Sequence, residues 1–190
     1  MSLITYEDSL AMPENKLEEI LHGESRIMPP ATRRHVNVVE KLGAMLRSLL
    51  DERDSTVIIA GAGLGIERDP LTYRIPDLMV FRTEVLRQDE AGAADNDPYI
   101  WTVPELLVEC LSPSNRKGSV RELLADYAQI AVPEVWLLDP AIPQFTSYRY
   151  ESAAPLEFHS QDHGAVSPLL LPNMTVDLDE LWAAFHGRLK

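Results

Sequence analysis

The sequence predicts an α/β protein of the α+β-like kind, in which helices pack against a mixed β-sheet and an antiparallel extension follows. Apolar runs rich in β-branched residues recur along the chain and are typical of strands. A helical pattern at 118–130 separates two of these runs, which is typical of a βαβ unit with a parallel strand pair. More polar segments at 144–150 and 155–159 favour an antiparallel hairpin. We expect one domain over 1–190.

Composition restricts the classes of function. The chain has 190 residues, of which 45% are apolar and 25% charged, as in globular proteins. No apolar run approaches the roughly 20 residues that span a membrane, and no signal peptide is evident, so we expect no membrane association. A single cysteine, Cys110, lies in an apolar run, which predicts a buried thiol and fits a reducing cytoplasm. The net charge of -13 argues against broad binding to phosphate backbones, although a bound metal reverses the local charge.

Periodicity predicts the elements of the first half of the chain. In order, they are a short helix at 13–22, a strand at 25–28, a long helix at 32–50, and strands at 56–60 and 76–82. Gly23 is expected to end the first helix, and Thr32 to cap the second. The glycines after residue 60 indicate a bulged or tightly turning strand pair rather than a phosphate loop, because no Gly-Lys-Ser/Thr follows them.

The second half is predicted in the same way. A surface loop is expected at 88–100, strands at 104–111 and 134–139, the helix at 118–130 between them, and a closing helix capped by Asp177 or Asp179. The apolar face of that closing helix contains Leu178, Leu181, Trp182 and Phe185. We interpret this face as part of the core, and a dimer interface remains the alternative.

Two of the predicted strands each carry one acid in an otherwise apolar run. Asp77 follows Pro76, and Glu109 lies between Val108 and Cys110. A buried carboxylate is costly unless a charge opposes it, and Mg²⁺ prefers oxygen ligands. Adjacent strands would bring the two acids together as a metal site, with the carbonyl of Cys110 as a backbone ligand. The residues alone leave open that Asp77 is a turn former and that Glu109 pairs with Arg74 or Arg116.

Six sequence elements occur in order through almost the whole chain: LHGE at 21–24, MPP at 28–30 leading to His35, IPD at 75–77, LVECLSPS at 107–114, YAQIAVPEVWLLDP at 127–140 and SPLLLP at 167–172. Together they resemble the putative restriction endonuclease family of the PD-(D/E)XK nuclease superfamily. The resemblance implies a restriction-endonuclease-like core, usually dimeric, that uses Mg²⁺ (or Mn²⁺). It implies that Asp77 and Glu109 match the metal-binding acids and that Glu24 matches a further acid. His35 either approaches the site or caps and packs its helix.

The chain departs from the family pattern at the catalytic lysine. The superfamily places this lysine two residues after the second acid, where Leu111 stands, and the family often places it on the following helix, where Leu123 stands. Lys117 and Arg121 are the remaining basic candidates for contacting phosphate. Arg121 lies two residues from the expected position, so on a helix it points about 200° away.

The leading hypothesis is therefore a Mg²⁺-dependent DNA endonuclease that hydrolyses phosphodiesters and is impaired if no other cation replaces the lysine. The alternative is a catalytically inactive homodimer of nuclease fold with a binding or regulatory role. A more distant alternative is an enzyme that acts on a small phosphorylated molecule.

Overall fold

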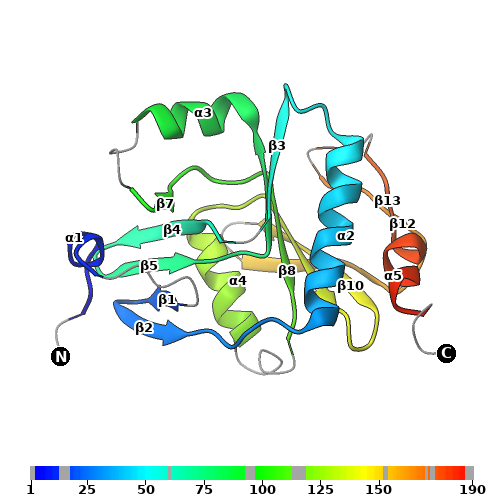
Figure 1. Cartoon of the computed structure of the whole chain (residues 1–190), viewed down its shortest axis with the longest axis horizontal. Coiled ribbons are helices and arrows are strands. Elements are labelled where there is room, and N and C mark those ends of the chain that lie inside the picture. Colours follow the sequence, from blue (N-terminus) through cyan, green and yellow to red (C-terminus); the bar gives the residue numbers. More distant parts are fainter. Residues whose placement is uncertain are drawn as a thin grey trace.

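The computed structural model describes residues 3–12, 18–59, 61–92, 97–112, 119–151, 154–169, 171 and 174–186. Within these residues, helices surround a six-stranded and a five-stranded sheet, and a small two-stranded sheet forms late in the chain (Figure 1). The helices are α1 (Tyr6–Leu10), α2 (Arg33–Leu49), α3 (Thr83–Gly92), α4 (Ser119–Gln129) and α5 (Leu178–His186). Among the described residues, no helix combines the length and apolarity required to cross a membrane.

The six-stranded sheet forms the centre of the molecule. Its strands, in order across the sheet, are β11 (Ala154–Gln161), β10 (Gln144–Glu151), β9 (Glu134–Asp139), β8 (Leu106–Cys110), β6 (Leu78–Arg82) and β3 (Ser55–Ile59). β8 and β9 are parallel and α4 connects them, whereas β9–β10 and β10–β11 are antiparallel. The predicted βαβ unit, the hairpin and the α/β class with a mixed sheet are thereby confirmed.

The five-stranded sheet lies beside α4 and takes its strands from residues 18–100. Its order is β2 (Glu24–Ile27), β1 (Glu18–Leu21), β5 (Leu71–Arg74), β4 (Gly63–Arg68) and β7 (Tyr99–Ile100), and the small sheet pairs β12 (Ala165–Val166) with β13 (Val176–Asp177). The register of β4 against β5 shifts between Gly65 and Glu67. The bulged strand pair predicted after the glycines is therefore confirmed.

The helix predicted at 13–22 is wrong over its described part, because residues 18–21 form strand β1; residues 13–17 lie outside the described residues. β1 pairs with β2 on one side and β5 on the other. Ile20 and Leu21 are both buried although successive strand residues point to opposite faces. Burial on both faces produced a spacing that resembled a helix face. Gly23 makes the tight turn into β2 at a φ of 78°.

The surface loop predicted at 88–100 is wrong at both ends, because α3 continues to Gly92 and residues 99–100 form β7. Residues 93–96 lie outside the described residues. Along α3 only Thr83 and Leu86 are buried, so its sequence lacks the wide apolar stripe that predicts a helix.

Helix α2 agrees with its prediction at both ends, and its buried face does not extend to the first turn. The Thr32 hydroxyl accepts a hydrogen bond from the His35 N–H at 3.2 Å and caps the helix. Val36 is 45% exposed, whereas Leu42 is fully buried. Strand β3 is largely half-buried because it forms an edge of the sheet.

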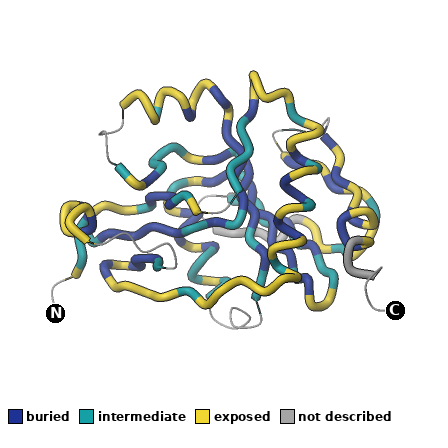
Figure 2. Tube along the Cα trace, in the orientation of Figure 1, coloured by how far each residue is buried: buried dark blue, intermediate teal, exposed yellow. Residues whose placement is uncertain are grey.

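The central sheet is covered on both faces, and alternation along its strands assigns each side chain to one face. Leu78 and Val108 pack with α2 and α5, while Met79 and Leu107 pack with α4. Buried residues accordingly follow the strands through the middle of the molecule (Figure 2). In α5, Leu178, Leu181 and Trp182 are buried in the core, as predicted, and the Phe185 side chain lies outside the description.

Candidate active site

Asp77 and Glu109 lie side by side where β6 begins and β8 ends. The two strands are antiparallel, with Leu78 opposite Val108. Continuing this register by one residue places Asp77 beside Glu109, and alternation directs both toward the α4 face of the sheet. Strand adjacency thus joins two acids that are 32 positions apart in the sequence.

The Asp77 carboxylate is held from two directions. Its Oδ2 accepts a hydrogen bond from the Cys110 backbone N–H at 2.8 Å, and its Oδ1 lies 2.7 Å from Nε2 of His35. Because an ionised carboxylate can only accept, Nε2 of His35 carries the hydrogen in that pair. The His35 side chain therefore reaches the site, which is the first of the two alternatives left open by the sequence, and Thr32 rather than His35 caps the helix.

The Glu109 carboxylate is half-buried and accepts a hydrogen bond from the Tyr127 hydroxyl on α4. Burial, followed by the neighbouring Asp77 charge, raises the pKa of Glu109 well above its usual value, and the Tyr127 hydrogen bond opposes this rise. Burial and the Glu109 charge also raise the pKa of Tyr127, which keeps the phenol a donor. A carboxylate whose pKa is raised by burial and by a neighbouring acid favours a cation close to it.

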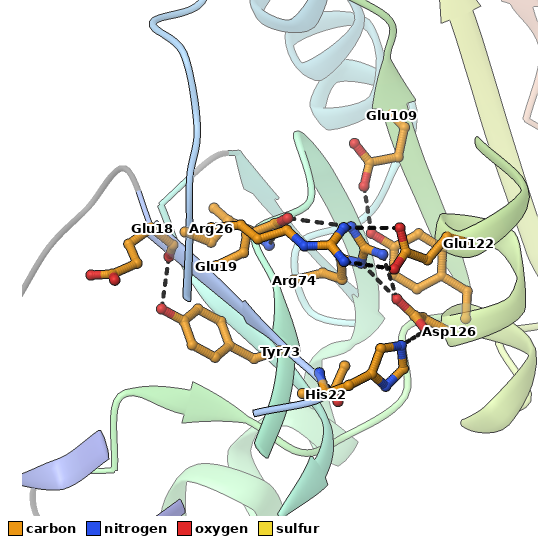
Figure 3. Close-up of polar contacts among 12 residues, drawn as sticks. Glu18, Glu19, His22, Arg26, Tyr73, Arg74, Glu109, Glu122 and Asp126 are labelled. Carbon is orange, nitrogen blue, oxygen red and sulfur yellow. Dashed lines mark hydrogen bonds and ion pairs between the residues drawn. The ribbon is translucent and has the colours of Figure 1, made fainter. Parts of the chain in front are cut away.

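A buried ion triad forms one wall of the site. Arg74 donates from Nη2 and Nε to Oδ2 of Asp126, at 2.5 and 2.8 Å, and from Nη1 to Oε2 of Glu19 at 3.3 Å. Figure 3 shows Arg74 between Glu19 and Asp126, with the Glu109 side chain pointing toward this triad. Glu19 also accepts the Ile75 N–H at 2.9 Å. Arg74 therefore pairs with Glu19 and Asp126 rather than with Glu109, the partner left open by the sequence.

Asp77 and Glu109 share one cavity of about 210 Å³ with His35, Arg74 and Glu19. Its ionisable lining residues, other than Cys110, are Glu19, Arg26, His35, Arg74, Asp77 and Glu109 within the described part of the chain. Leu111 and Leu123 also line it. Both positions where the family resemblance places a lysine are thus apolar wall.

The other predicted site residues do not reach this cavity in the described structure. Arg121 is exposed on α4, Glu24 is exposed on β2, and neither lines the cavity. Lys117 lies outside the described residues. The Cys110 side chain is buried, as predicted, and burial raises the pKa of its thiol. The sequence did not predict that its backbone N–H would hold Asp77.

Sequence reasoning missed Glu19, which is the acid of the N-terminal region that lines the cavity. Burial raises its pKa, and the Ile75 N–H and Arg74 oppose that rise. Interpreting 13–22 as a helix separated Glu19 from strand β5. The available signal was an acid next to the apolar pair Ile20-Leu21. This signal indicates a site residue only when residues 18–21 are assigned to a strand.

The donor set fits a hydrated divalent cation. Within the described residues, no three His, Cys, Asp or Glu side chains are grouped as a metal-binding set. Mg²⁺, however, is commonly held by one or two carboxylates with water completing its shell. Two adjacent carboxylates, one with a raised pKa, supply such a pair.

The Uma2 family, whose description reads "Putative restriction endonuclease", matches residues 6–179. The chain belongs to this family. The match contains every element that lines the cavity, and it confirms the family resemblance noted in the sequence. No curated protein matches the chain.

A crystal structure from Anabaena variabilis, described as a putative nuclease belonging to DUF820, superposes on this chain with a TM-score of 0.77. The two are 18% identical, and the superposition covers 95% of this Uma2 chain and 98% of the other. At that identity the likeness establishes the shared fold.

Proposed function

We propose that this chain is a metal-dependent nuclease that hydrolyses phosphodiester bonds in DNA, with Asp77 and Glu109 holding Mg²⁺ or Mn²⁺. The observation that carries the proposal is the adjacency of these two carboxylates at a cavity, where burial and mutual repulsion raise the pKa of Glu109. The family description and the Anabaena structure, which is described as a putative nuclease, support the reaction class. A bound cation would supply Lewis acidity and lower the pKa of a coordinated water.

The surrounding residues have defined tasks in this proposal. His35 and the Cys110 N–H fix the orientation of Asp77 through their hydrogen bonds. Tyr127 does the same for Glu109 and favours its ionised form. The Cys110 carbonyl remains our proposed backbone ligand. The Arg74 triad keeps the wall rigid, because breaking a buried ion pair is costly.

Metal-dependent stability tests the site directly. We expect Mg²⁺ or Mn²⁺ to raise the unfolding temperature of the wild type. At a metal concentration 100 times Kd, the free energy of unfolding should increase by about 2.7 kcal/mol. Asp77→Asn should abolish this rise because it removes one of the two ligand charges. Thermal unfolding with and without EDTA measures both.

Glu24→Gln is the matched control, since it also neutralises one acid but lies outside the cavity. It should keep the full metal response; a lost response would instead make Glu24 a ligand. If neither cation stabilises the wild type, the metal site is refuted.

A second candidate function is a non-catalytic, homodimeric protein that binds nucleic acid or regulates another process. The apolar Leu111 and Leu123, at both positions expected for the lysine, favour it. Metal binding without cleavage of single- or double-stranded DNA would support this candidate over the nuclease. Sedimentation equilibrium would test the proposed homodimer independently of either activity.

A further inference from the structure

We propose that Arg26 is the phosphate-contacting cation of this site, and that Glu122 is the internal anion from which a bound phosphodiester releases it. The inference rests on the proposed function and names the residue that takes over phosphate contact where the lysine is missing.

The geometry places Arg26 at the cavity in a form suited to oxyanions. Arg26 comes from β2 and lines the same cavity as Asp77 and Glu109. Its Nη1 and Nη2 donate to the two carboxylate oxygens of Glu122 on α4, at 3.0 and 3.1 Å, as Figure 3 shows. This two-bond arrangement is the one that a guanidinium also makes with phosphate oxygens.

Exposure distinguishes Arg26 from Arg74, the other arginine among the described lining residues. The Arg26 and Glu122 side chains are 47% and 31% exposed, whereas those of Arg74 and Asp126 are 6% and 2% exposed. An ion pair open to water contributes little to stability, so a phosphate can replace Glu122 at small cost. Arg74 is already bound by two buried acids and would leave them unpaired if it moved.

The position of Glu122 connects this pair to the missing lysine. Glu122 immediately precedes Leu123, so the Arg26 guanidinium reaches the segment of α4 where the family pattern places the lysine. The hydrogen bonds from Arg26 are the largest cause of the lowered pKa of Glu122, and the charges of Arg26 and then Arg74 lower it further. Arginines from β2 and β5 thus act on the place of Glu122.

A purely structural role predicts a different outcome from phosphate contact. If the pair only ties β2 to α4, Arg26→Ala and Glu122→Gln break the same link and should act in the same direction. If Arg26 contacts phosphate, Arg26→Ala should weaken binding and Glu122→Gln should strengthen it, because the second change frees the guanidinium.

The test measures binding of inorganic phosphate and of a short single-stranded DNA in EDTA buffer, where the proposed metal-dependent reaction does not consume the DNA. We expect Arg26→Ala to weaken DNA binding about tenfold and to lower the salt dependence by about one phosphate contact. Glu122→Gln should tighten binding, and Arg26→Lys should retain part of it. Circular dichroism and unfolding temperature establish that each variant folds.

Two controls separate the proposal from a general charge effect. The gain from Glu122→Gln should vanish in the Arg26→Ala background, since it acts through Arg26. Arg121→Ala removes an exposed cation from the same helix outside the cavity and should change binding little. A gain that persists without Arg26, or equal losses for Arg26→Ala and Arg121→Ala, would overturn the inference.

The outcomes also separate this inference from the proposed function. If the wild type binds DNA but Arg26→Ala and Glu122→Gln act alike, the role of Arg26 is refuted and the nuclease proposal stands. If phosphate binding shows the opposed effects and DNA does not bind, Arg26 is an anion-binding residue and the DNA substrate is refuted. If neither probe binds, the role of Arg26 is refuted, and the metal response of the wild type and Asp77→Asn decides the nuclease proposal separately.

Discussion

At the scale of the residue, the protonation of Glu109 controls the charge of the site. Burial and Asp77 disfavour its ionised form, while the Tyr127 hydrogen bond favours it. If the pair binds a metal as proposed, a cation and a proton would compete for the same carboxylates. In the proposed function, a bound divalent ion would relieve the cost of holding these two acids close together.

The raised pKa of Glu109 predicts how stability depends on pH in the metal-free protein. Unfolded Glu109 releases its proton near pH 4.3, while the folded protein retains it to a higher pH. The folded state thus binds more protons in this window, and stability should fall as pH rises through it. Glu109→Gln should remove this fall, as measured by urea midpoints in EDTA from acid to neutral pH.

Tyr127→Phe supplies an opposite variant for the same measurement. It removes the hydrogen bond that lowers the pKa of Glu109, so the fall in stability should extend to higher pH. Losing the phenol hydroxyl should also cost about 1–3 kcal/mol, because a buried acceptor is left unpaired. Identical pH profiles for the wild type and Glu109→Gln would show that the site does not contain a shifted carboxyl.

At the scale of the element, the ion triad joins three segments that the sequence separates. Glu19 lies on β1, Arg74 at the end of β5 and Asp126 on α4. Asp126 also lies 3.9 Å from Nε2 of His22, in the turn after β1. The triad fixes α4 against the five-stranded sheet and thereby positions Tyr127, the next residue, against Glu109.

Arg74→Leu should be strongly destabilising for this reason. It leaves Glu19 and Asp126 buried without their counter-ion, which costs about 3–5 kcal/mol. The urea midpoint should fall accordingly. Arg53→Leu, which breaks an exposed pair with Asp51, should leave the midpoint nearly unchanged. Equal effects of the two variants would mean that the triad does not stabilise the fold.

At the scale of the whole molecule, the site lies where the two large sheets meet. β5 of the five-stranded sheet ends at Arg74, and β6 of the six-stranded sheet begins at Leu78. Asp77 lies in the short connection between them. The cavity takes residues from β1, β2, β5, β8, α2 and α4, so its geometry depends on the sheets forming together.

Single-domain behaviour over 1–190 remains a prediction, and cooperative unfolding tests it. Trp101 packs with Tyr6 and Tyr99 beside the five-stranded sheet, whereas Trp136 packs in the core of the six-stranded sheet. Variants that retain one of these tryptophans as a fluorescence reporter should unfold at the same urea midpoint. Two separated midpoints would show that the sheets unfold as independent domains.

Much of the architecture could be predicted because local pattern and tertiary structure agree there. Helix α2, the βαβ unit and the hairpin follow from periodicity and from Thr32 at a helix start. β1 and α3 could not be predicted from pattern. Burial on both faces removes the alternation expected of strand β1, and the mostly exposed α3 lacks the apolar stripe expected of a helix. The cytoplasmic location inferred from the single cysteine stays a prediction.

The sequence by itself determined the two acids, their apolar surroundings and the family, because these depend on residue type and order along the chain. It also determined that leucine occupies both expected lysine positions. Only the tertiary structure decided that Glu19, Arg26 and His35 join these acids, since such proximity arises from strand pairing and helix packing over long sequence separations. The same packing decided that Arg74 is bound by buried acids, whereas Arg26 pairs with Glu122 in a partly exposed ion pair.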